Sequence, residues 1–184
     1  SEMCIRDRKL TFKYKKQLIL KSPTHTSIVK NIIKLFPDAK FVHIHRNPYK
    51  VFCSTLKLYD TIINECLLQK SKFQVVDRII QQYDLLYKAY LRDVKLVAPD
   101  HVTELSYKSL VDDPVAALRN IYKTLDLQGF ETAKVAVEEK LSLDKVFKKN
   151  TFQKLQPEIA AKIQEGWENY FRIWNYDLEA YQAA

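Results

Sequence analysis

The stretch LILKSPTHTSIVKNIIKLFPDAKFVHIHRNPYKVFCSTLKLY, residues 18–59, predicts the start of an α/β fold. Residues 18–20 are an apolar run that is too short for a helix and is stopped by Pro23, which is typical of a buried strand. Over residues 26–36 the apolar side chains fall on one face of a helix. A second strand is expected at Phe41–His45. The order strand, helix, strand is that of two parallel strands joined by a crossover helix.

Asn47 and Pro48 end the second expected strand and form a favourable helix start. Asparagine is a preferred N-cap, and proline is well suited to the first helical position because it needs no hydrogen bond from its nitrogen there. The helix that we expect to follow includes Ser54 and Leu58.

The remainder of the chain continues the alternation of strands and helices. We expect a long amphipathic helix over residues 76–94, a third strand over residues 101–105, a helix opened by Asp113 and Pro114, and a last helix over residues 157–173. The pattern predicts the α/β class, with a parallel sheet flanked by helices.

The composition excludes several classes of protein. Of 184 residues 47% are hydrophobic, enough for a core, but no run approaches the roughly 18 apolar residues of a membrane span. Two glycines leave no glycine-rich phosphate loop, and three cysteines show neither zinc-ligand spacing nor a disulfide framework. We expect reduced thiols and no membrane segment.

The charge is unevenly distributed along the chain. The net charge is +8, and residues 1–21 hold seven Lys or Arg against two acidic residues. No aromatic interleaving or RNA-binding motif accompanies these cations, so we expect no nucleic-acid partner. No repeat or low-complexity linker divides the chain, and we expect a basic N-terminal segment over residues 1–17, one domain over residues 18–177 and a tail over residues 178–184.

Polar residues follow each expected strand, where open parallel sheets bind their ligands. They are KSPTH after the first strand, Arg46 after the second, and SYK, which contains Tyr107, after the third. Arg46 can bind a phosphate through two parallel hydrogen bonds, and the Ser54 hydroxyl, on the following helix, could bind the same phosphate. The alternative, equally favoured by spacing alone, is a surface arginine and a helix serine bonded to its own backbone.

Lys21 and His25 are candidate catalytic residues after the first strand. Lysine can neutralise charge that develops in a transition state, and histidine can accept a proton near neutral pH. The alternatives are a solvated lysine and a histidine that caps the next helix. His43 and His45 lie inside a strand, where buried, hydrogen-bonded histidines are more common than ligands, and no acidic partner stands at metal-ligand spacing. No metal site is predicted.

Two blocks of the chain resemble one enzyme family. Residues 18–59 resemble the sulfotransferases that use 3′-phosphoadenosine 5′-phosphosulfate, in the branch with K-S-P followed by L-F-P-D-A-K-F-[IV]-x-[IL]-x-R-[DN]-P. Residues 105–114, LSYKSLVDDP, look like the family's Y-E-D-L-x-x-D-P segment, with Lys108 and Ser109 in place of its Glu-Asp pair. The resemblance covers about residues 18–177.

The resemblance implies a fold like that of the P-loop kinases and assigns roles by position. Arg46 and Ser54 match the pair that binds the 3′-phosphate of the donor, Tyr107 matches a tyrosine near its adenosine, and Lys21 matches the strand-end lysine of the active site. His25 is a candidate base, although K-S-P-x-H differs from the K-x-H spacing of the cytosolic members.

The family's first strand and glycine-containing loop for the 5′-phosphosulfate have no counterpart in residues 1–17. We therefore expect an incomplete domain that lacks this first strand and phosphate loop and most of the catalysis.

The expected reaction is metal-free transfer of a sulfuryl group to an acceptor hydroxyl or amine on a small molecule, a glycan or a peptide. If a segment of this chain reaches the acceptor, we expect it within residues 59–73. The resemblance leaves the cytoplasm and the Golgi lumen open as compartments. Two alternatives are a small-molecule or nucleotide kinase, and a non-catalytic basic binding module.

Overall fold

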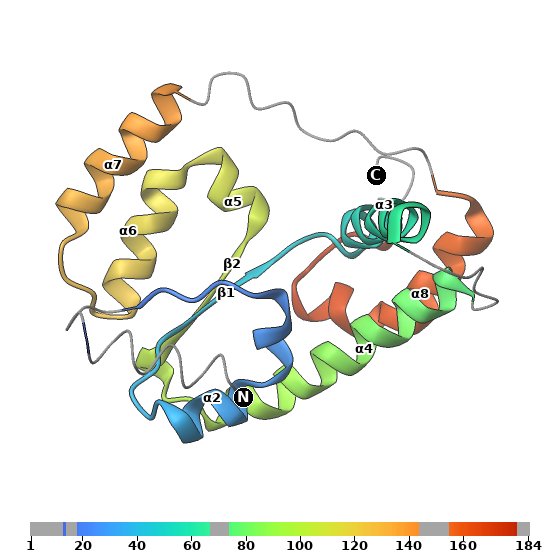
Figure 1. The fold of residues 1–184 in the computed structure, drawn as a ribbon, viewed down its shortest axis with the longest axis horizontal. Coiled ribbons are helices and arrows are strands. Elements are labelled where there is room, and N and C mark those ends of the chain that lie inside the picture. Colours follow the sequence, from blue (N-terminus) through green and yellow to red (C-terminus); the bar gives the residue numbers. More distant parts are fainter. Residues whose placement is uncertain (1–12, 14–17, 67–73, 144–154, 180–184) are drawn as a thin grey trace.

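Two short parallel strands lie at the centre of the fold, with helices on both sides (Figure 1). The computed structural model describes residue 13 and residues 18–66, 74–143 and 155–179. In chain order the elements are η1 (Pro23–Ser27), α2 (Val29–Leu35), β1 (Phe41–His45), α3 (Pro48–Cys66), α4 (Val75–Asp93), η2 (Val94–Leu96), η3 (Pro99–His101), β2 (Val102–Ser106), α5 (Tyr107–Asp112), α6 (Pro114–Thr124), α7 (Phe130–Leu143) and α8 (Pro157–Ile173), where η marks a 3₁₀ helix.

The sheet confirms the expected parallel arrangement for the second and third strands. β1 and β2 pair in register from Phe41 opposite Val102 to His45 opposite Ser106, so their carboxyl ends lie side by side. Most of the described chain is helical, and the class is a mostly helical α/β fold with a small sheet.

The expected strand at residues 18–20 is wrong for this structure. These residues have no regular secondary structure, and the Ile19 side chain is 93% exposed. A strand is stabilised by a hydrogen-bonded neighbour, and among the described residues the sheet contains β1 and β2 alone. The apolar run therefore has no described strand to pair with.

Local capping chemistry fixes several helix starts. The Asn47 side chain accepts hydrogen bonds from the backbone N–H groups of Tyr49, at 3.0 Å, and Lys50, at 3.3 Å, which confirms the expected N-cap of α3.

The expected helices over residues 76–94 and 157–173 are observed as α4 and α8. The helix expected over residues 26–36 is divided into η1 and α2, and α5 and α7 lie in segments where no helix was expected.

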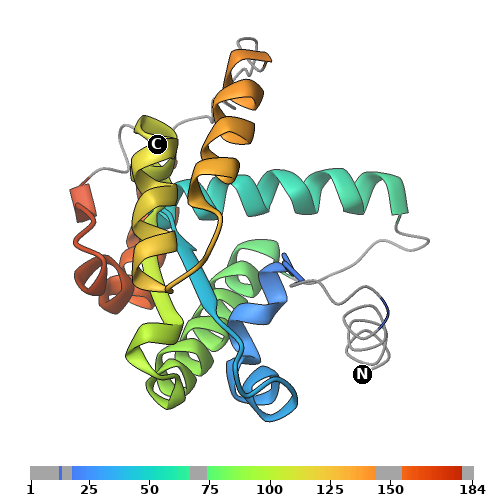
Figure 2. The same ribbon diagram turned by 90° about the vertical axis from the view of Figure 1, so that its left-hand side faces the viewer.

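The core lies between α4, α8 and the start of α3. Its largest fully buried side chains include Trp167, Tyr49, Phe52, Tyr170 and Phe171. The Trp167 ring stacks on Tyr83 of α4 with ring centroids 3.9 Å apart, and its indole N–H donates to the Ile80 carbonyl at 3.0 Å. The C-terminal part of α3 projects away from this core (Figure 2).

Candidate anion-binding site

Arg46 and Tyr107 meet at the carboxyl ends of the two strands. Arg46 directly follows β1, and Tyr107 directly follows β2 as the first residue of α5. The guanidinium carbon of Arg46 lies 4.6 Å from the centroid of the Tyr107 ring, a cation–π contact. The parallel register puts these two strand ends together, as expected from the sequence.

The Arg46 guanidinium has no anionic partner in the described part of the chain. Its side chain is half-buried, and its Nε is buried without a hydrogen-bond partner there. Among the described residues no Asp or Glu forms an ion pair with it. A partly desolvated cation without a counter-charge is unfavourable, and an anion placed at this point would offset that cost.

Ser54 lies on an exposed part of α3, within two turns of its start. The next residue, Thr55, donates its hydroxyl to the Val51 carbonyl at 2.8 Å, whereas the Ser54 hydroxyl has no such bond among the described residues. The alternative of a serine bonded to its own helix is therefore not what the structure shows. No described contact joins Ser54 to Arg46.

Lys21 and His25 are not brought into contact with Arg46 in the described structure. Lys21 is exposed just before η1, and His25 is half-buried within η1, which packs against α4. The His25 carbonyl accepts a hydrogen bond from the Ile28 N–H at 3.1 Å, so its backbone helps to end the 3₁₀ turn. Of the five predicted site residues, the structure joins Arg46 and Tyr107 by direct contact.

A network of polar and aromatic side chains lies on the face of the sheet that carries His43 and His45. His43 is buried and its Nδ1 lies 3.1 Å from Glu104 Oε1, which confirms the structural role expected for it. Because a carboxylate can only accept, His43 donates this hydrogen bond. Tyr90 of α4 donates to the same Glu104 oxygen at 2.5 Å. The hydrogen bond from His43 is the main reason why the pKa of Glu104 is lowered to about 2.

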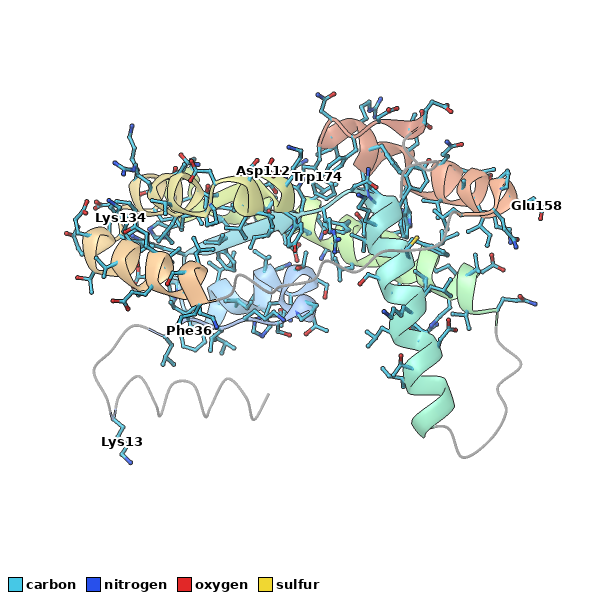
Figure 3. All side chains as sticks on the ribbon, turned by 90° about the horizontal axis from the view of Figure 1, so that it is seen from above. Lys13, Phe36, Asp112, Lys134, Glu158 and Trp174 are labelled. Carbon is cyan, nitrogen blue, oxygen red and sulfur yellow. The ribbon has the colours of Figure 1, made fainter. Side chains whose placement is uncertain are left out.

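His45 is held by two aromatic residues that follow α8. Its Nδ1 lies 2.8 Å from the Tyr176 hydroxyl, and its ring is stacked on Trp174 at a centroid distance of 5.3 Å. Figure 3 labels Trp174 at the end of α8. Burial lowers the pKa of His45 and the neighbouring His43 lowers it further, whereas Glu104 opposes this shift.

Tyr176 was missed by the sequence reasoning, although the motif WNYD stands out directly after the last helix. Two aromatic residues just past a helix end indicate that the chain folds back onto the core there. The sequence does not show which strand they would contact.

The described residues contain no group of three or more His, Cys, Asp or Glu side chains that could hold a metal ion. In the same part of the chain, no helix has the length and apolar character needed to cross a membrane.

Comparison with protein families matches residues 7–132 to the sulfotransferase family. Two curated relatives are the omega-hydroxy-beta-dihydromenaquinone-9 sulfotransferases Stf3 of Mycobacterium bovis and Mycobacterium tuberculosis. Each is 34% identical over 167 residues, which are 90% of this chain and 43% of the relative. The chain thus spans less than half the length of the curated relatives that it matches.

The fold also resembles a solved structure, that of sulfotransferase STF9 from Mycobacterium avium. The TM-score is 0.71 at 18% sequence identity, and the match covers 87% of this chain and 42% of that chain. At this sequence identity the similarity shows the fold alone.

Proposed function

The chain belongs to the sulfotransferase family, and from this premise we propose that the complete gene product transfers a sulfuryl group from 3′-phosphoadenosine 5′-phosphosulfate to an acceptor hydroxyl. The observation that carries the proposal is Arg46, a half-buried guanidinium at the end of β1 that has no anionic partner among the described residues. A site that presents an uncompensated planar cation is suited to a phosphate, because guanidinium binds phosphate oxygens in pairs.

In this proposal Arg46 and Ser54 bind the 3′-phosphate of the donor, and Tyr107 lines the adenosine side of the site. Two features support the assignment. The Ser54 hydroxyl, on the first turns of α3, has no hydrogen bond among the described residues, and the positive end of the α3 dipole lies close to Arg46. The Tyr107 ring supports the guanidinium from one side.

Lys21 and His25 are the proposed groups for the chemical step. The acceptor oxygen attacks the sulfur atom, the bond between sulfur and the bridging phosphate oxygen breaks, and adenosine 3′,5′-bisphosphate leaves. Lys21 would stabilise negative charge on the transferred or leaving oxygens, and His25 would take the proton of the acceptor. A carboxylate outside the described residues is an equally good candidate for the base.

The names of the relatives support a proposal on the acceptor class. Their names place the sulfated hydroxyl at the omega position of a dihydromenaquinone. We therefore propose that the acceptor of this protein is a hydroxyl on a predominantly apolar molecule rather than on a glycan or a peptide.

The donor site is tested by measuring the affinity of the complete gene product for adenosine 3′,5′-bisphosphate and for adenosine 5′-phosphate. Arg46→Ala should weaken binding of the bisphosphate by about tenfold or more, since charge-assisted hydrogen bonds are each worth about 1.5–3 kcal/mol, and should leave the monophosphate nearly unaffected. Arg119→Ala is the matched control, because Arg119 also lies over an aromatic ring, that of Phe130 at 4.9 Å. An Arg46→Ala variant that binds the bisphosphate as well as the wild type contradicts the proposal.

The two alternatives predict other results. A kinase would use ATP in place of the sulfate donor in the same activity assay. A basic binding module would lose affinity steeply with salt and show no preference for the 3′-phosphate.

A further inference from the structure

The two residues proposed for the 3′-phosphate carry less positive charge than that phosphate carries negative charge. A phosphate monoester bears about 1.5 to 2 negative charges at neutral pH. Arg46 supplies a single positive charge and Ser54 supplies none. The N-terminus of a helix adds the equivalent of about half a charge. A second cation close to the start of α3 would complete the balance.

Lys50 lies in the first turn of α3, between Arg46 and Ser54 in the chain. The helix begins at Pro48, and the Lys50 N–H donates to the Asn47 side chain at 3.3 Å, which places Lys50 within the capped turn. In a helix every Cα–Cβ bond is tilted toward the N-terminus. The Lys50 side chain therefore leaves the backbone toward the end of the helix that follows Arg46.

Ser54 lies one turn further along the same face of α3. Both residues are inside the helix, and residues four apart in a helix are neighbours, with Cβ atoms about 5–6 Å apart. The lysine ammonium stands on a flexible stem of four carbons. An anion that contacts the Ser54 hydroxyl from the Arg46 side is therefore within reach of Lys50.

The positive charge of Lys50 is not neutralised by the part of the chain that the structure describes. The residue is half-buried, and no described Asp or Glu forms an ion pair with it. Lys108, which stands near the end of β2, is by contrast paired with Asp112. A partly desolvated ammonium without a counter-charge favours an anionic ligand for the same reason as the Arg46 guanidinium does.

We propose that Lys50 is a further binding residue of the anion site and contributes the second positive charge to the 3′-phosphate of the donor. Its ammonium adds a mobile point charge beside the paired hydrogen bonds of the Arg46 guanidinium. The inference rests on the proposed function, because it adds a residue to the site assigned to this phosphate. Lys50 then helps to distinguish a nucleotide with a 3′-phosphate from one without it.

The test measures 3′-phosphate selectivity, the ratio of the affinities for adenosine 3′,5′-bisphosphate and adenosine 5′-phosphate, in variants of the complete gene product. Lys50→Met keeps an apolar stem and removes the charge, and should lower the selectivity about fivefold, as for a partly exposed charged contact. Lys50→Arg keeps the charge and should retain most of the selectivity. Lys57→Met is the matched control, since Lys57 lies on the same face of α3 about two turns further from Arg46. Arg46→Lys, which loses the paired geometry, is the benchmark for a damaged site.

The variants separate the role of Lys50 from the proposed function itself. A lower selectivity in Lys50→Met, with Lys57→Met and Lys50→Arg close to the wild type, supports the inference. If Arg46→Lys lowers the selectivity and Lys50→Met does not, the role of Lys50 is overturned and the anion site stands. If neither variant changes the selectivity, the proposed donor site fails and the role of Lys50 fails with it.

Two further results would also overturn the inference. Equal losses in Lys50→Met and Lys57→Met would show a long-range effect of net charge rather than contact with the phosphate. Equal losses in Lys50→Met and Lys50→Arg would show that the packing of the lysine stem matters and its charge does not.

Discussion

His43 and Glu104 face each other as register partners of the two parallel strands, and their side chains are joined by a hydrogen bond of 3.1 Å. Tyr90 donates a second hydrogen bond to the same carboxylate from α4. Glu104 therefore connects β1, β2 and α4 at one point. The carboxylate is held in its ionised form, with a pKa lowered to about 2.

We expect acid to weaken the fold through Glu104. Its pKa in the folded protein is below the ordinary value of 4.5, so its stabilising contribution is complete above that value and is lost as the pH falls toward 2. Glu104→Gln should lower the melting temperature at pH 7, and the difference from wild type should shrink at pH 3. Glu158→Gln, at an exposed position of α8, is the control. A difference that stays constant between the two pH values contradicts this prediction.

Tyr107 should contribute to ligand affinity through its ring and not through its hydroxyl. Tyr107→Leu removes the cation–π contact with Arg46 and should weaken binding of adenosine 3′,5′-bisphosphate about three- to fivefold, the value of an exposed contact of this kind. Tyr107→Phe should bind like the wild type. Titration calorimetry on both variants measures the effect, and equal losses in the two would assign the contribution to the hydroxyl instead.

Gly166 is required by the close approach of α8 to α4. A Cβ atom at this position would lie 2.7 Å from Ile80 Cγ2, which is closer than carbon atoms tolerate. Overpacking of this kind costs about 1–3 kcal/mol, against a gain of about 1 kcal/mol in helix propensity, so Gly166→Ala should lower the free energy of unfolding. In an Ile80→Ala background the clash is removed, and there Gly166→Ala should be neutral or stabilising. Urea unfolding of the four proteins decides between packing and propensity.

Asn175 should be replaceable by glycine and not by valine. Its left-handed φ is free of strain for glycine, whereas a β-branched residue pays about 1–2 kcal/mol or more there. Asn175→Val should therefore lower the free energy of unfolding, which urea denaturation measures. Asn175→Gly should preserve the free energy of unfolding. An equal loss of stability in the two variants would contradict this prediction and show that the asparagine side chain itself stabilises the turn.

Several elements could be predicted because their signals are local. The Asn47-Pro48 start of α3, the strand at Phe41–His45 and the start of α8 all depend on neighbouring residues, and each is observed. α7 was missed because its apolar residues do not gather on one face, and Val135 and Leu143 remain exposed. The strand at residues 18–20 was wrong because a strand depends on a partner as well as on its own residues.

The sequence by itself determined the family resemblance, the parallel pair of strands and the placement of Arg46 and Tyr107 directly after them. It could do so because strand ends and helix caps are set by residues close together in the chain, and because parallel strands bring their carboxyl ends to one edge. Only the tertiary structure decided that Tyr176 reaches His45 across 131 positions and that Glu104 accepts from both His43 and Tyr90. Such contacts depend on the packing of α4 against the strands and of α8 against α4, and the chain fixes that packing only when it folds as a whole.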